Sequence, residues 1–106
     1  MSYRRGKMDA NHKTLADLFR QLGCSVVDMP STGIPGWPDM AVGVVTAKGR
    51  RNKLIECKNP ETQYGRSGFN ANQTAFNAEW KGEPVEIVST EDEVIALVRK
   101  WRRKEP

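Results

Sequence analysis

Three short apolar runs follow one another in the first half of the chain, and they limit its fold more than any other feature. They cover residues 24–29, 39–45 and 53–58, and each is too short for a helix of ordinary length. Their valine and isoleucine content favours strands. A segment with three prolines and two glycines, residues 30–38, separates the first two runs, and a polar turn at 47–52 separates the last two. We therefore predict three consecutive strands.

A helix is predicted before these strands, over residues 10–22. Its apolar residues recur at helical spacing and form one stripe, made by Leu15, Leu18, Phe19 and Leu22. Asp9 or Asn11 supplies the N-cap, and Gly23 ends the helix. The two cysteines, Cys24 and Cys57, lie in strand-like runs and are expected to be reduced thiols.

Two further helices are predicted in the second half of the chain. Residues 70–82 carry an Asn70 N-cap with Gln73 three positions on, which is a capping-box pattern, and Gly82 is expected to end this helix. Residues 84–89 read as a fourth strand. Residues 90–103 form a closing helix that Thr90 caps, with acids in its first turn and bases in its last.

The predicted order is helix, three strands, helix, strand, helix, which gives an α/β fold with a mixed central sheet flanked by helices. The short link between the second and third strands makes them antiparallel, and the long link to the fourth strand allows a parallel crossover. With 106 residues and no internal linker, the chain is expected to be one domain over residues 1–106.

The charge balance favours an anionic partner. The net charge is +4, and basic residues gather near the start of the chain, around residues 48–53 and at its end. Nucleic acid is the first expectation for such a balance, and ordinary solubility is the alternative. No apolar stretch is long enough to span a membrane and no secretory signal is evident, so a cytoplasmic protein without membrane association is expected.

Charged side chains within the apolar runs indicate a site. Because side chains alternate along a strand, Glu56 and Lys58 share one face, while Ile55 and Cys57 point to the other. Asp39 opens the neighbouring antiparallel strand and should lie beside the end of the third. An exposed ion pair and a turn aspartate are the ordinary explanations of these residues taken singly. Together, Asp39, Glu56 and the backbone carbonyl of Cys57 form an oxygen ligand set of the kind Mg²⁺ or Mn²⁺ prefers.

The spacing of these residues resembles a known family. Pro38-Asp39, followed after 16 residues by Glu56-Cys57-Lys58, is similar to the motif of the PD-(D/E)xK nuclease superfamily. With the preceding helix and the NANQTAFNAEW segment, the chain resembles small stand-alone VRR-NUC-type nucleases and phage resolvase-like proteins, over residues 9–98. The resemblance implies a restriction-endonuclease-like αβββαβ core, dependence on Mg²⁺ or Mn²⁺, hydrolysis of phosphodiesters in branched or duplex DNA, and a homodimer.

The resemblance also implies roles for individual residues. Asp39 and Glu56 match the metal carboxylates, Lys58 matches the catalytic lysine, and Gln73 matches a glutamine placed near the metal-bound water. Gln73 can serve in the capping box as well. The first helix departs from the pattern, because Thr14 stands where relatives often carry a glutamate. Asp9, Asn11 or Asp17 is a partial substitute, and one or two metals remain open.

Residues outside the motif are candidates for DNA contact. The basic ones lie in the two turns and are Lys48, Arg50, Arg51 and Arg66. Trp37 and Tyr64 either stack on bases or pack within their loops. His12, the single histidine, is expected to be solvent-exposed.

The predicted function is a metal-dependent endonuclease that recognises DNA structure, such as a Holliday junction. A non-catalytic or partner-dependent DNA-binding module is the alternative. A sequence-specific restriction-type enzyme is a weaker third, because little chain remains for recognition loops.

Overall fold

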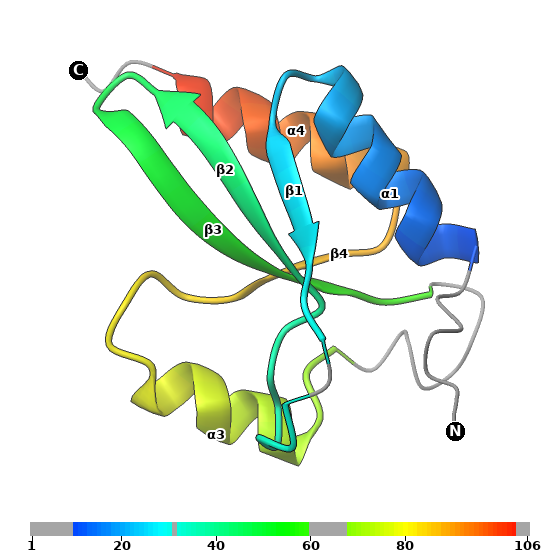
Figure 1. Cartoon of the computed structure of the whole chain (residues 1–106), viewed down its shortest axis with the longest axis vertical. Coiled ribbons are helices and arrows are strands. Elements are labelled where there is room, and N and C mark those ends of the chain that lie inside the picture. The colour runs from blue at the N-terminus through cyan, green and yellow to red at the C-terminus, as the bar shows by residue number, and fades with distance from the viewer. Residues whose placement is uncertain (1–9, 31, 60–67, 104–106) are drawn as a thin grey trace.

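The computed structural model describes residues 10–30, 32–59 and 68–103 (Figure 1). Within this part of the chain it forms three helices and four strands, which are α1 (Ala10–Gln21), β1 (Ser25–Asp28), β2 (Met40–Thr46), β3 (Gly49–Cys57), α3 (Ala71–Glu79), β4 (Glu86–Val88) and α4 (Glu91–Arg102). The predicted element order is confirmed. Among the described residues, no helix combines the length and apolarity needed to cross a membrane.

The four strands form one mixed sheet in the order β1-β2-β3-β4. β2 pairs antiparallel with both β1 and β3, while β4 pairs parallel with β3, as predicted from the lengths of the connections. Met40 lies opposite Ile55 in the β2–β3 register. This register sets the first residue of β2 beside the last residues of β3.

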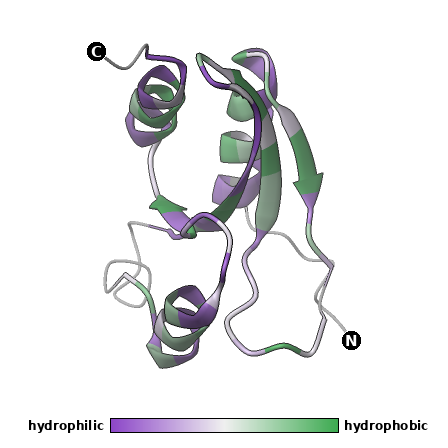
Figure 2. Ribbon diagram, turned by 90° about the vertical axis from the view of Figure 1, so that its left-hand side faces the viewer, coloured by the Kyte–Doolittle hydropathy of each residue, from purple (hydrophilic) through white to green (hydrophobic). Residues whose placement is uncertain are grey.

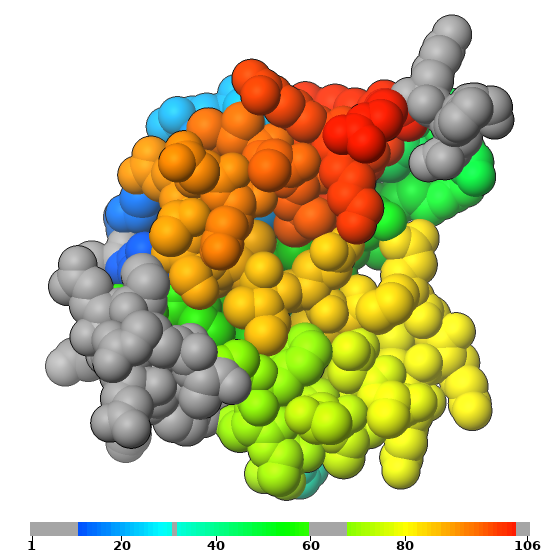
Figure 3. All heavy atoms as spheres, turned by 180° about the vertical axis from the view of Figure 1, so that it is seen from behind, coloured from blue at the N-terminus to red at the C-terminus, as the bar shows by residue number. Residues whose placement is uncertain are grey.

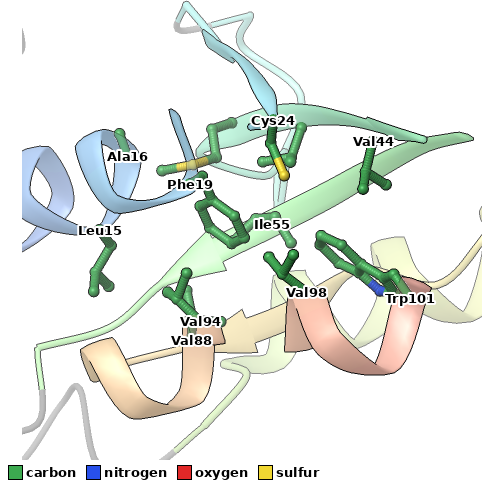
Figure 4. Close-up of a cluster of buried hydrophobic side chains, with 12 residues drawn as sticks. Leu15, Ala16, Phe19, Cys24, Val44, Ile55, Val88, Val94, Val98 and Trp101 are labelled. Atoms are coloured by element: carbon green, nitrogen blue, oxygen red, sulfur yellow. The ribbon is translucent and has the colours of Figure 1, made fainter. Parts of the chain in front are cut away.

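Helices α1 and α4 cover one face of the sheet and enclose the core (Figures 1 and 4). The core comprises Leu15, Ala16, Phe19, Cys24, Met40, Val42, Val44, Ile55, Val88, Val94, Val98 and Trp101. Phe19 of α1 stacks on Trp101 of α4, with ring centroids 6.0 Å apart. The core therefore depends on the apolar stripe predicted for the first helix. Cys24 and Cys57 are free thiols, as predicted.

The opposite face of the sheet is only partly covered. α3 lies apart from α1 and α4, near the end of β3 (Figures 1 and 2). Val27 and Val45, whose positions alternate with core residues, remain 62% and 66% exposed. The prediction that helices flank the sheet is therefore confirmed for the face under α1 and α4, while α3 lies beyond the end of the sheet rather than against its other face (Figure 1).

Helix ends follow the predicted capping residues with one exception. Asn70 and Thr90 each form a complete capping box, with Gln73 and Glu93 respectively, and Gly23 adopts φ 91° after α1. α3, however, ends at Glu79 rather than near Gly82, because Trp80 leaves the helical conformation at ψ 129°. The ring of Trp80 stacks on that of Phe76, with centroids 5.2 Å apart.

The predicted polar turn at 47–52 is shorter than expected. Only Ala47 and Lys48 form the turn, and β3 already begins at Gly49, which pairs with Thr46. Arg50, Arg51 and Asn52 continue the ladder because the backbone of β2 needs partners there, and their polar side chains meet solvent or Glu83. The long hairpin carries these cations well beyond the core.

Candidate active site

Asp39 is held beside the end of β3 by two backbone contacts. Its N–H donates to the carbonyl oxygen of Ile55 at 3.0 Å, which extends the β2–β3 ladder by one residue. The N–H of Cys57 in turn donates to Asp39 Oδ2 at 2.7 Å. The strand register thus fixes this carboxyl next to Glu56, the neighbourhood predicted from the hairpin.

Glu56 and Lys58 are the two buried charged residues of the described chain, with 6% and 5% of their surfaces exposed. Lys58 Nζ lies 3.7 Å from Glu56 Oε2. The N–H of Lys58 donates to Val88 of β4 at 3.0 Å, so the backbone stays within the sheet beyond the last residue of β3. Burial of charge is costly unless the groups are paired, and here acid and base lie on one face as predicted.

Gln73 joins this pair to α3. Its Nε2 donates to Glu56 Oε2 at 2.7 Å, and its Oε1 accepts from Lys58 Nζ at 2.9 Å. The same Oε1 accepts from the backbone N–H of Asn70 at 3.0 Å and so closes the capping box. The two roles that the sequence left open for Gln73 are therefore compatible: its side chain caps α3 and contacts both charged residues.

The negative charges of Asp39 and Glu56 are unfavourable in this site, because the pKa values of both carboxyls are raised. Burial raises the pKa of Asp39, opposed chiefly by the hydrogen bond from Cys57. Burial, reinforced by the charge of Asp39, raises the pKa of Glu56 to about 8, against the opposing charge of Lys58. Glu56 Oε1 is buried and receives no hydrogen bond from a described residue. Two adjacent carboxylates, one of them with a buried oxygen that accepts no hydrogen bond, are stabilised by a proton or a cation bound between them.

The donor set fits a hard divalent cation. Two carboxylates, Asp39 and Glu56, are the number typical of a Mg²⁺ site, where water and substrate supply the other ligands. Within the described ranges no group of three or more His, Cys, Asp and Glu side chains is arranged to hold a metal, so these two acids would act alone among such residues. The Cys57 carbonyl as a third ligand stays a prediction.

A hollow of about 520 Å³ leads to the two carboxyls from outside. Asp39, Glu56 and Gln73 line it on one side, and the loop before β2 and the start of α3 line the other. Its polar lining there includes Thr32, Asn70 and Asn72, and the described lining residues include no lysine or arginine. The acids are thus accessible to a ligand that brings its own positive charge.

The first helix contributes an amide rather than a carboxylate. Asn11 Nδ2 donates to the carbonyl oxygens of Lys58 at 2.9 Å and Ser89 at 3.2 Å. Thr14 is exposed, and Asp17 forms surface ion pairs with Lys13 and Arg20. Asp9 lies outside the described residues. Of the proposed substitutes that the structure describes, Asn11 is therefore the one in contact with the site. Asn11 precedes Leu15 of the apolar stripe by four residues, and this spacing indicates that its side chain lies on the same face of the helix.

The expectation that His12 is solvent-exposed is wrong. Its side chain is only 16% exposed, and its Nε2 lies 3.0 Å from Asp28 Oδ1 at the end of β1. His12 is also among the groups whose charge lowers the pKa of Asp39. Sequence reasoning missed this contact because α1 and β1 meet through tertiary packing, which no local pattern records.

Of the described DNA-contact candidates, Trp37 lines the hollow beside Asp39, whereas the basic ones lie away from it. Trp37 packs edge-on against Phe76 and Trp80, at centroid distances of 5.5 and 6.1 Å, so the loop-packing alternative describes it. Lys48, in the turn before β3, lies roughly 25 Å from Glu56 at 3.3 Å per strand residue, and Arg50 and Arg51, at the far end of β3, lie roughly 15–20 Å from it. Tyr64 and Arg66 lie outside the described residues. The structure brings together the acids, Lys58 and Gln73, whereas Arg50 and Arg51 lie away from them.

Comparisons with protein-family models, with curated proteins and with solved structures gave no match for this chain. The site therefore rests on its own geometry.

Proposed function

We propose that the chain is a divalent-metal-dependent DNA endonuclease with a restriction-endonuclease-like core. The observation that carries this is the half-buried carboxyl of Asp39 beside the buried Glu56, whose Oε1 receives no hydrogen bond from a described residue, with Lys58 Nζ 3.7 Å from Glu56 Oε2. A second acid beside the buried Glu56–Lys58 pair adds negative charge that costs stability. Such a cost is typical of sites that bind a ligand or perform chemistry.

In this proposal each residue has a separate task. Asp39 and Glu56 would hold Mg²⁺ or Mn²⁺, which when bound would lower the pKa of a water and neutralise charge on the scissile phosphate. Lys58 places a positive charge next to the carboxylates, where it stabilises negative charge that develops on the phosphate. Gln73 keeps Lys58 and Glu56 in fixed relation through its two hydrogen bonds. The hollow beside Asp39 admits the DNA strand that is cut.

DNA structure, rather than base sequence, is the proposed determinant of substrate choice. The described residues form one sheet with its helices and leave no separate unit to read bases. Branched DNA such as a four-way junction offers a distinct shape, and its symmetric cleavage requires two copies of the site, hence a homodimer.

A partner-dependent DNA-binding module is the second candidate, and the first helix favours it. Among the described residues of this helix, Asn11 contacts the backbone of Lys58 with an amide, and no carboxylate takes part in the site. With two carboxylates alone, metal affinity in the isolated chain is expected to be low. This candidate predicts DNA binding without hydrolysis by the purified chain.

A cleavage panel tests the proposal. Labelled four-way junction, flap and duplex DNA are incubated with the chain in Mg²⁺ or Mn²⁺, next to Asp39→Asn, Glu56→Gln and the control Glu79→Gln on the exposed end of α3. The expected result is cleavage by the wild type and the control, and none by the other two. Cleavage that survives in both site variants contradicts the proposal. DNA binding with no cleavage of any substrate favours the second candidate.

A further inference from the structure

A second hollow lies at the opposite end of β3, between the hairpin and the last turn of α4. It measures about 230 Å³. In Figure 1 and, from behind, in Figure 3, the red end of α4 lies against the green hairpin. The residues that line this hollow are Thr46, Ala47, Lys48, Arg51, Lys53, Lys100, Trp101 and Arg103. We name these residues the hairpin pocket. Basic residues 50 positions apart in sequence thus converge on one hollow.

The pairing of its cations is incomplete. Arg51 and Lys53 share the carboxylate of Glu83, and Lys53 also lies over the ring of Trp101, 5.5 Å from its centroid. Lys48, Lys100 and Arg103 form no ion pair with any described residue. Two cations are therefore held in place by the fold, while three are left to act on a ligand.

The net charge of the hairpin pocket is strongly positive. Of its five cationic side chains, two contact Glu83, and Lys100 and Arg103 lie at the C-terminal end of α4, whose backbone carries about half a negative charge. The partial charge at the end of α4 is thus too small to neutralise all the basic side chains around it. By contrast, nearby Arg102 donates to the Leu22 carbonyl at the end of α1 and has a structural role.

We propose that the hairpin pocket binds backbone phosphates of a DNA double helix, at a distance from the phosphate that is cut. The ligand class rests on the proposed function, since DNA is the polyanion that the acidic site would cleave. Roughly 25 Å of strand separate Lys48 from Glu56, which corresponds to about seven base pairs. The pocket thus engages an arm of the substrate, and the hollow at Asp39 engages the strand to be cut.

Salt dependence of binding tests this proposal without any need for cleavage. Every protein carries Glu56→Gln, and the affinity for a labelled junction with 15-base-pair arms is measured against salt concentration. The pocket variant replaces Lys48, Lys100 and Arg103 with Gln. The control variant replaces Lys13, Lys81 and Arg99, which are exposed, do not line the pocket and remove the same charge.

The pocket variant is expected to lower the salt slope by about two to three, since each lost phosphate contact contributes about 0.9. The control is expected to lower it by less than one. Shortening the arms to five base pairs should then weaken binding by the parent and control but not by the pocket variant. An equal loss in both variants, or arm dependence that survives in the pocket variant, overturns the proposal. Failure of the cleavage panel leaves this measurement valid.

Discussion

The two ends of strand β3 carry charge in opposite ways. At the end near α3, Glu56 and Lys58 are buried and bound to each other, to Asp39 and to Gln73. At the hairpin end, Lys48 and Arg50 are exposed to solvent. Burial strengthens electrostatic interactions and shifts pKa values, whereas exposed charges are screened by salt. One strand thus joins a place suited to chemistry with a place suited to salt-sensitive binding.

The same substitution made at both ends separates these roles most strongly. Lys58→Met should lower the cleavage rate by about 10²–10⁴-fold, because it removes the ammonium group that lies 3.7 Å from Glu56. Lys48→Met should change the rate at low salt by only a few fold, since it removes one screened contact. Cleavage rates on a junction substrate, with circular dichroism to verify folding, check both. Equal losses at the two ends would break the distinction.

The pH dependence of stability provides the next contrast. The pKa of Glu56 is raised from 4.5 to about 8 in the folded state, so between these values the folded chain binds more protons than the unfolded one. Stability of the metal-free protein should therefore fall as pH rises from about 4.5 to 8, on the order of 5 kcal/mol, and stay level for this group below that range.

Urea unfolding at several pH values measures this fall. Glu56→Gln should remove most of it, and Mn²⁺ added at pH 8 should restore stability to the wild type but not to this variant. Glu83→Gln, at the hairpin end, serves as the matched control and should keep the wild-type slope. A wild-type stability that rises over the same range would contradict the burial argument.

The smallest effect concerns Gln73, which caps α3 and contacts the site. Asn70→Ala and Gln73→Ala should each lower the free energy of unfolding by about 1 kcal/mol through loss of the capping box. Only Gln73→Ala should also lower cleavage, by about tenfold to a hundredfold, because its bonds to Glu56 and Lys58 are lost. Glu79→Ala, at the exposed end of α3 and outside both hollows, should leave the rate near that of the wild type. Parallel unfolding and rate measurements distinguish these outcomes.

Local patterns predicted most of the fold and the buried end of β3. The apolar stripe of α1, the caps Asn70 and Thr90, and the alternation along β3 are short-range signals that the structure bears out. The meeting of Asp39 with Glu56 followed from antiparallel register alone, because the hairpin length fixes which residues face each other.

Other features depend on contacts between distant elements and leave no local signal. The polar residues Arg50 to Asn52 predicted a turn, yet these residues pair with β2, whose backbone groups require hydrogen-bond partners there. His12 looked solvent-exposed because Asp28 reaches it only through tertiary packing. The hairpin pocket joins residues 48 and 103, and no local pattern indicates that the bases at the end of α4 lie beside those of the hairpin.

The loose attachment of α3 has a consequence for how the molecule opens. This helix has no buried residue. Its contacts with the rest of the molecule include the packing of its Phe76 against Trp37 and Trp80, the close approach of Gly36 to Asn72, and the hydrogen bonds of Gln73. The core beneath α1 and α4 does not include it. α3 therefore belongs to the low-stability part of the native ensemble, and it can detach while the sheet stays folded. Each such excursion separates Gln73 from Glu56 and Lys58, so the site is lost and rebuilt without global unfolding.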